Sequence, residues 1–285
     1  MGKAVYTTMI EALRQMFAFD FMRNALLVGA AVSLCAALLG VSLVLKRYSM
    51  IGDGLSHVGF GAMAIAAVLN LAPLAVAVPV VIAAAFLLLR ISSSAKIKGD
   101  AAVALISTGA LAIGVMAISV KKGMNTDVYN YMFGSILSMS ASDVYVSMSL
   151  AAAVLILFVL FYHKLFAVTF DETFARATGT NASAYNALLA LLTAITIVLG
   201  MRMMGAMLIS SLVIFPALSA MRVCRTFRGV VVCSAIISLV CFMAGMTVSY
   251  LWDTPAGAGV VCANIAAFLA FSAVGLLRGG MKKKN

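Results

Sequence analysis

The sequence predicts an all-α polytopic membrane protein with eight or nine transmembrane helices and one short cytoplasmic helix. Of the 285 residues, 64% are hydrophobic and only 10% are charged, and the mean hydropathy is +1.13. A soluble domain carries about a quarter charged residues, so this chain could not cover a water-exposed surface. Its apolar residues form runs close to the ~20 residues that a membrane span requires, and its basic residues gather between those runs.

Nine apolar runs have the length of a membrane span. The second and third are separated only by a turn at residues 70–73, and the sixth and seventh only by Arg202 and its neighbours. The seventh run is short and contains Pro216, so a broken or re-entrant segment is an alternative to a ninth span. The runs, which make up one transmembrane domain over residues 1–285, are 24–45, 51–69, 72–89, 101–120, 143–162, 183–201, 205–221, 229–251 and 257–277.

The basic residues also orient the bundle, because cytoplasmic loops carry an excess of Lys and Arg. If the C-terminus is cytoplasmic and nine spans alternate backwards from it, 14 of the 20 Lys and Arg residues lie in the cytoplasm. We therefore expect the C-terminus inside and the N-terminus outside. The same clustering identifies the net charge of +11 as a topology signal, so we expect membrane lipid rather than nucleic acid as the partner.

Two connecting segments are long enough to form structure of their own. Outside, residues 121–142 carry apolar side chains at helical spacing, which indicates an interfacial helix or a lid over the bundle. Inside, residues 163–182 contain Thr169-Phe-Asp-Glu172, which fits a capping box with Thr169 as N-cap, and Gly179 would end the helix. The pattern predicts a short helix across the cytoplasmic face, either a docking element for a soluble partner or a plain connector.

Several catalytic motifs are missing from the sequence. There is no GxxxxGK(S/T), so the chain cannot hold ATP phosphates in a P-loop of its own, and neither HExxH nor GxSxG occurs. The five cysteines form no CxxC pair, which indicates buried thiols that act as small hydrophobic side chains. Candidate chemistry is therefore confined to ionisable residues at the apolar runs.

Asp53 and His57 stand at the head of the second apolar run. Four residues apart on a helix, they share one face, with Ser56 beside them. An ionisable residue inside a membrane is energetically expensive and marks a functional site by default. Carboxylate and imidazole are both ligands for divalent first-row metal ions. The pair therefore predicts metal or proton handling, and an Asp–His hydrogen bond that only fixes packing is the alternative.

One helix supplies only two such ligands, fewer than a metal ion takes. A two-fold dimer with the same helix of each subunit at its axis would double them. Gly52, Gly54, Gly59 and Gly61 flank the pair and would let neighbouring helices approach closely. The apolar pattern places Asp53 near the cytoplasmic end of its span. Either the helix begins deeper than the pattern indicates, or the pair serves the exit of an ion.

Five segments of the sequence resemble the permease subunits of ABC-type zinc, manganese and iron importers. They are MIGDGLSHVGFGAMAIA, VYNYMFGSIL, FDETFARATGT, MRMMGAMLISSLVIFPALSAMRV and PAGAGVVCANIAAFLAF. They follow in the order and spacing of that family over most of the chain. Many relatives read Asp-Ala-(Leu/Ile)-Ser-His with a proline soon after the histidine. Here Gly54 replaces the alanine and no proline follows, which puts the local kink in doubt but not the ligands.

The resemblance implies roles for particular residues. Asp53 and His57 match the polar pair that lines the metal path, with Ser56 as their supporting neighbour. The cytoplasmic segment matches the coupling helix that contacts the ATPase. Its candidate contact residues are Thr169, Asp171, Glu172, Phe174, Arg176 and Gly179.

The resemblance also implies partners and a location. Such permeases pair as homodimers or heterodimers in the inner (cytoplasmic) membrane, dock two cytoplasmic ATPase subunits and receive metal from an extracytoplasmic binding protein. The transported ion would be zinc, manganese or iron, with no permanently bound cofactor. The two side chains do not choose between these metals, because His57 favours zinc whereas Asp53 favours manganese or iron.

Three other functions stay open on the sequence alone. An ion- or proton-coupled secondary carrier would use Asp53 and His57 as a proton relay. Such carriers often contain internal repeats, and the later half has no second copy of Asp-x-x-Ser-His, which counts against this function. A membrane-embedded enzyme would need a catalytic set made from two histidines, Asp53 and scattered serines. A non-transporting scaffold is the third alternative.

Overall fold

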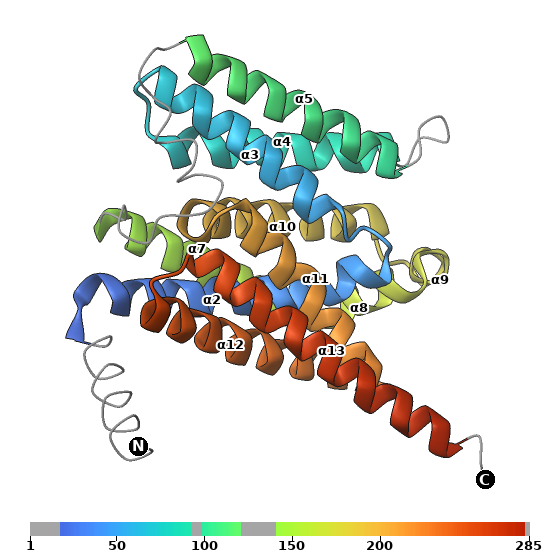
Figure 1. Cartoon of the computed structure of the whole chain (residues 1–285). Coiled ribbons are helices and arrows are strands. Elements are labelled where there is room, and N and C mark those ends of the chain that lie inside the picture. The colour runs from blue at the N-terminus through green and yellow to red at the C-terminus, as the bar shows by residue number, and fades with distance from the viewer. Residues whose placement is uncertain (1–17, 93–98, 121–140, 283–285) are drawn as a thin grey trace, which may run out of the picture.

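The computed structural model describes residues 18–92, 99–120 and 141–282 as helices joined by short turns (Figure 1). Within these ranges, nine helices are long and apolar enough to cross a membrane. They are α2 (Asp20–Leu45), α3 (Ile51–Val68), α4 (Pro73–Ser92), α5 (Gly99–Val120), α7 (Ala141–Leu160), α10 (Ala182–Met204), α11 (Ala206–Val223), α12 (Phe227–Trp252) and α13 (Ala256–Lys282). Two short helices, α8 (Tyr162–Phe170) and α9 (Glu172–Ala177), lie between α7 and α10.

The predicted all-α membrane bundle is confirmed, and the described residues support nine spans rather than eight. The seventh apolar run forms one continuous helix, α11, with Pro216 buried inside it. The alternative of a broken or re-entrant segment is therefore wrong. Membrane helices tolerate proline where surrounding groups satisfy the freed backbone carbonyl. Residues 121–140, which hold most of the predicted outer helix or lid, lie outside the described residues.

The helices form two layers (Figure 1). One layer contains α3, α4 and α5, and the other contains α2, α7, α12 and α13. α10 and α11 join the layers, because each contacts α3 as well as α2. α2 begins at one end of the bundle, whereas α9 and the end of α13 lie at the other. The positive-inside bias assigns this second end to the cytoplasm.

Glycines allow α3 to pack closely against its neighbours. A Cβ atom on Gly61 would lie 2.5 Å from the backbone carbonyl oxygen of Ala110 in α5. A Cβ atom on Gly59 would lie 2.5 Å from the methyl group of Met201 in α10, and Gly52 faces α11. Small residues let helices in lipid pack through direct backbone contact. The predicted role of these glycines is confirmed, and they fit α3 between three helices.

A tight turn fixes where α3 begins. The backbone amide of Tyr48 donates to the carbonyl of Leu43 at 2.8 Å, and that of Arg47 to Val44 at 3.1 Å. Together these two bonds make a Schellman motif. Arg47 holds the left-handed conformation with φ 61°, which costs a residue other than glycine about 1–2 kcal/mol. The connection between α2 and α3 is therefore short and geometrically defined.

An ion pair joins two helices at the end of the bundle opposite α9. Arg202 of α10 and Asp143 of α7 lie 2.6 Å apart, and their side chains are only 19% and 17% exposed. Separating two such largely buried charges would leave each without its counter-charge, which is strongly unfavourable. The pair therefore holds the end of α10 against the start of α7.

The close contact between α3 and α5 can be tested with two alanine substitutions. Gly61→Ala places a methyl group against the backbone of α5, and we expect it to lower the free energy of unfolding by about 1–3 kcal/mol. Gly109→Ala on α5 is the control, because nothing lies within 4 Å of its Cβ position. Thermal unfolding of the purified protein in detergent measures both. Equal melting temperatures for the two variants would contradict the packing described here.

Candidate functional site

Asp53 and His57 lie on one face of the first two turns of α3. His57 Nε2 is 3.6 Å from Asp53 Oδ2, which is longer than a hydrogen bond. The histidine side chain is 26% exposed and the aspartate side chain 45%, whereas the α3 residues between them are buried. Two ligands at ~2.1 Å from a tetrahedral ion stand ~3.4 Å apart. The separation in the structure is close to that of two ligands of one metal ion.

Two serines contact Asp53 in different ways. Ser210 of α11 donates a hydrogen bond to Asp53 Oδ1 at 3.3 Å. Ser56 is buried, and its hydroxyl donates to the backbone carbonyl of Asp53 at 2.7 Å, so it stabilises the helix turn rather than the carboxylate. Sequence reasoning missed Ser210. The available signal was its place in MRMMGAMLISSLVIFPALSAMRV, one of the five family-like segments.

The depth of Asp53 follows from the helices that surround it. Gly59, six residues further along α3, lies against Met201, near the end of α10 at Met204. Because a helix rises 1.5 Å per residue, Asp53 lies ~9 Å along α3 from that contact. Its partner Ser210 is only the fifth residue of α11. Asp53 is thus in the first turn of α3 as expected, and Ile51 at the start of that turn lines a small cavity with Lys46 and Asn186.

The face that carries the pair is open. On α11, Ser210, which contacts Asp53, is half-buried as well. Within the described part of the chain, no group of three or more His, Cys, Asp or Glu side chains is placed to hold a metal ion. The described residues of one subunit therefore bring two metal-ligating side chains to this face.

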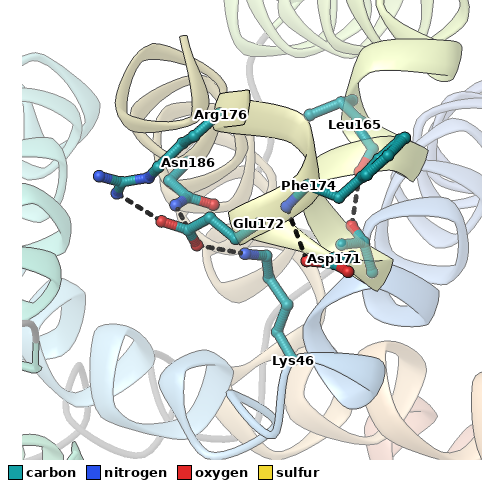
Figure 2. Close-up of polar contacts among 8 residues, drawn as sticks. Lys46, Leu165, Asp171, Glu172, Phe174, Arg176 and Asn186 are labelled. Carbon is teal, nitrogen blue, oxygen red and sulfur yellow. Dashed lines mark hydrogen bonds and ion pairs between the residues drawn. The ribbon is translucent and has the colours of Figure 1, made fainter. Parts of the chain in front are cut away.

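The cytoplasmic segment folds into two helices rather than one (Figure 2). Asp171 separates them and is the N-cap of α9, because its Oδ1 accepts a hydrogen bond from the amide of Phe174 at 2.9 Å. The predicted N-cap, Thr169, is therefore wrong. Thr169 lies in the last turn of α8, where its hydroxyl donates to the carbonyl of Leu165 at 2.6 Å. Threonine readily makes this bond inside a helix.

Gly179 follows the C-cap residue of α9 and stops the helix, as predicted. Gly179 has φ 81°, and its amide donates to the carbonyl of Arg176 at 3.0 Å. Ala175 is buried against α8 and α10, whereas Asp171, Phe174 and Arg176 are exposed. Phe174 is 65% exposed, and a large aromatic side chain beside charged residues is typical of a surface that binds another protein. One side of α9 therefore packs against the bundle, and the other side is exposed to solvent.

Glu172 is the centre of the polar contacts between α9 and the bundle (Figure 2). Its Oε2 accepts a hydrogen bond from Asn186 of α10 at 3.0 Å and lies 3.4 Å from Nζ of Lys46 at the end of α2. Its Oε1 accepts from Arg176 at 2.6 Å. Partial burial raises the pKa of the Glu172 carboxyl, but the two hydrogen bonds and the Lys46 charge together lower this pKa below its ordinary value.

The contribution of Glu172 to stability should depend on pH with a defined sign. Because its pKa is lowered in the folded protein, the contribution is complete above the ordinary value of 4.5 and is lost as pH falls through the lowered pKa. We expect the melting temperature of Glu172→Gln to lie below that of the unsubstituted protein by a constant margin at neutral pH. That margin should shrink below about pH 4.5. A margin that stays constant down to pH ~3 would contradict the carboxylate contacts described here.

Comparison with known proteins places the chain in a family. A profile of the ABC 3 transport family matches residues 18–275. The chain is 30% identical over 252 residues to the high-affinity zinc uptake system membrane protein ZnuB of Haemophilus influenzae, covering 88% of this chain and 96% of that protein. It is 26% identical to the manganese import system permease protein ScaB of Streptococcus gordonii, over 91% of this chain and 93% of that one.

The structural comparison agrees. PsaBC from Streptococcus pneumoniae, solved in complex with Fab, contains a chain that matches with a TM-score of 0.82 at 28% identity, covering 92% of this chain and 94% of that one. Both the sequence match and the helical architecture extend over most of the molecule. The chain therefore belongs to the ABC 3 transport family.

Proposed function

We propose that this chain is the membrane-spanning permease of an ATP-driven importer for divalent transition-metal ions. The feature that carries this function is the Asp53–His57 pair on an open face of α3. An oxygen and a nitrogen donor at 3.6 Å are placed like two ligands of one first-row metal ion. The zinc and manganese systems named among its relatives support a metal ion as the cargo.

In this proposal, transport and ATP hydrolysis are carried out by different subunits. The chain has no P-loop, so ATP hydrolysis is the task of separate cytoplasmic ATPase subunits, and the chain itself is a transporter subunit rather than an enzyme. The exposed side of α9, with Phe174 at its centre, is the surface that we assign to the ATPase. An extracytoplasmic binding protein would deliver the metal at the opposite side of the membrane, which is the inner membrane of the cell.

A second permease chain would complete the ion path. The described residues of one subunit bring two ligands to the open face of α3 and α11, and a two-fold partner would present the same face and double them. Closure of the ATPase pair would switch this assembly between outward-open and inward-open states. Binding must be weak enough for release, which favours a few ligands over a closed cage. Zinc, manganese and iron all suit such a set of oxygen and nitrogen donors.

Uptake of labelled zinc and manganese tests this function. Proteoliposomes would contain the permease, its ATPase subunits and the binding protein, and a matched preparation would carry an ATPase without its P-loop lysine. We expect metal accumulation that vanishes in the matched preparation. Accumulation that survives the loss of ATP hydrolysis would overturn the proposal in favour of an ion-coupled secondary carrier.

The metal ligands can be tested in the same preparation. We expect Asp53→Asn and His57→Ala to reduce uptake by at least about tenfold, because each removes one of two ligands that the subunit supplies. Membrane insertion and co-purification with the ATPase should not change. Asp253→Asn, which alters an exposed carboxylate in the turn after α12, is the control and should retain uptake. Normal uptake by both ligand variants would contradict the assignment.

A further inference from the structure

A lysine from the transmembrane bundle reaches the docking helix. Lys46 is the C-cap residue of α2, and its side chain is only 9% exposed. Its ammonium lies 3.4 Å from Oε2 of Glu172, beside a cavity whose lining is mostly apolar. A small cavity of about 20 Å³ lies between Lys46, Ile51 and Asn186. The structure thus buries a positive charge beside the carboxylate that centres the contacts of α9 (Figure 2).

The burial makes this ion pair hard to break. A buried ammonium that loses its counter-charge is strongly unfavourable, because the apolar surroundings cannot replace water. Besides the hydrogen bond from Asn186, Glu172 has one more charged partner, Arg176. Because Glu172 is 37% exposed and Arg176 61% exposed, solvent screens this second ion pair and it holds the carboxylate weakly. If α9 moves with its carboxylate, Lys46 must follow it. The pair therefore ties the position of α9 to the end of α2.

The same lysine begins the connection to the metal pair. Residues 46–50 join α2 to α3, whose first residue, Ile51, lines the small cavity with Lys46. Asp53 lies two residues after Ile51. The turn is fixed by the Schellman bonds and the left-handed backbone of Arg47. A displacement of Lys46 is therefore passed through a short, defined turn to the first turn of α3.

We propose that the Lys46–Glu172 ion pair transmits movement of α9 to the start of α3, and thereby controls the face that carries Asp53 and His57. The inference rests on the proposed function, in which α9 is moved by the ATPase. Lys46 and Glu172 are positioning residues in this account, because they act on the metal pair through the turn at residues 46–50. Packed helices shift between discrete arrangements, and this link decides whether ATP hydrolysis is converted into such a shift.

The number of metal ions transported per ATP hydrolysed tests the link. The full complex would be reconstituted with labelled manganese, and uptake and phosphate release would be measured together. For Lys46→Met we expect the ATPase to co-purify and hydrolyse ATP within about twofold of the normal rate, whereas the ion-to-ATP ratio falls about tenfold, a typical size for coupling between sites. A merely structural role would lower both activities together.

Two further variants control for misfolding and for the general effect of breaking an ion pair. Lys46→Met combined with Glu172→Met removes both charges at once and leaves no buried lysine unpaired, so it guards against loss of folding. We expect this double variant also to have a low ion-to-ATP ratio. Asp143→Asn breaks the ion pair between α7 and α10 at the far end of the bundle. This control should lower the melting temperature without changing the ion-to-ATP ratio.

The outcomes separate this link from the proposed function. A normal ion-to-ATP ratio in the double variant, or failure of Lys46→Met to co-purify with the ATPase, would overturn the link while leaving the importer intact. A ratio lowered equally by Asp143→Asn would overturn it as well, since any broken ion pair would then suffice. Absence of ATP-dependent uptake by the unsubstituted complex would instead overturn the proposed function, and the link with it.

Discussion

The close packing of α3 is the constraint on which the rest of this structure depends. In the proposed function, the ionisable pair has to be held in place and still be reached by an ion. Gly61 lets α3 approach the backbone of α5, and Gly59 makes room for the Met201 side chain of α10, so these helices cover the apolar sides of α3. The side that carries Asp53 and His57 is left open. Larger residues at the glycine positions would move α3 away from these neighbours and alter where the pair lies.

At the cytoplasmic end of the molecule, the short helix α9 has to be held in place. A six-residue helix is too short to be stable alone in water, yet in the proposed function α9 presents a surface to the ATPase. Its caps at Asp171 and Gly179 satisfy the helix ends, and Glu172 attaches the helix sideways to α2 and α10. Phe174 is left free to face outward. Glu172 therefore attaches α9 to the bundle, whereas Phe174, two residues later, faces outward.

The sequence predicts those features that depend on neighbouring residues. Apolar runs set the spans, and the spacing of Asp53 and His57 sets their common face. Contacts between distant segments are not encoded in any local pattern, so Lys46, Asn186 and Ser210 could not be assigned to their carboxylates. The capping box failed for a related reason. Thr169 and Asp171 both fit an N-cap, and the choice depends on where α8 stops, which is set by packing against the bundle rather than by the motif.

Zinc X-ray absorption spectroscopy of the reconstituted complex tests the central claim, that Asp53 and His57 hold the transported ion, most directly. The account predicts oxygen and nitrogen ligands at ~2.0–2.2 Å, and loss of the bound zinc in Asp53→Asn. Sulfur ligands at ~2.3 Å would point to the cysteines instead and contradict the assignment. Full retention of zinc by Asp53→Asn, with an unchanged spectrum, would contradict it as well.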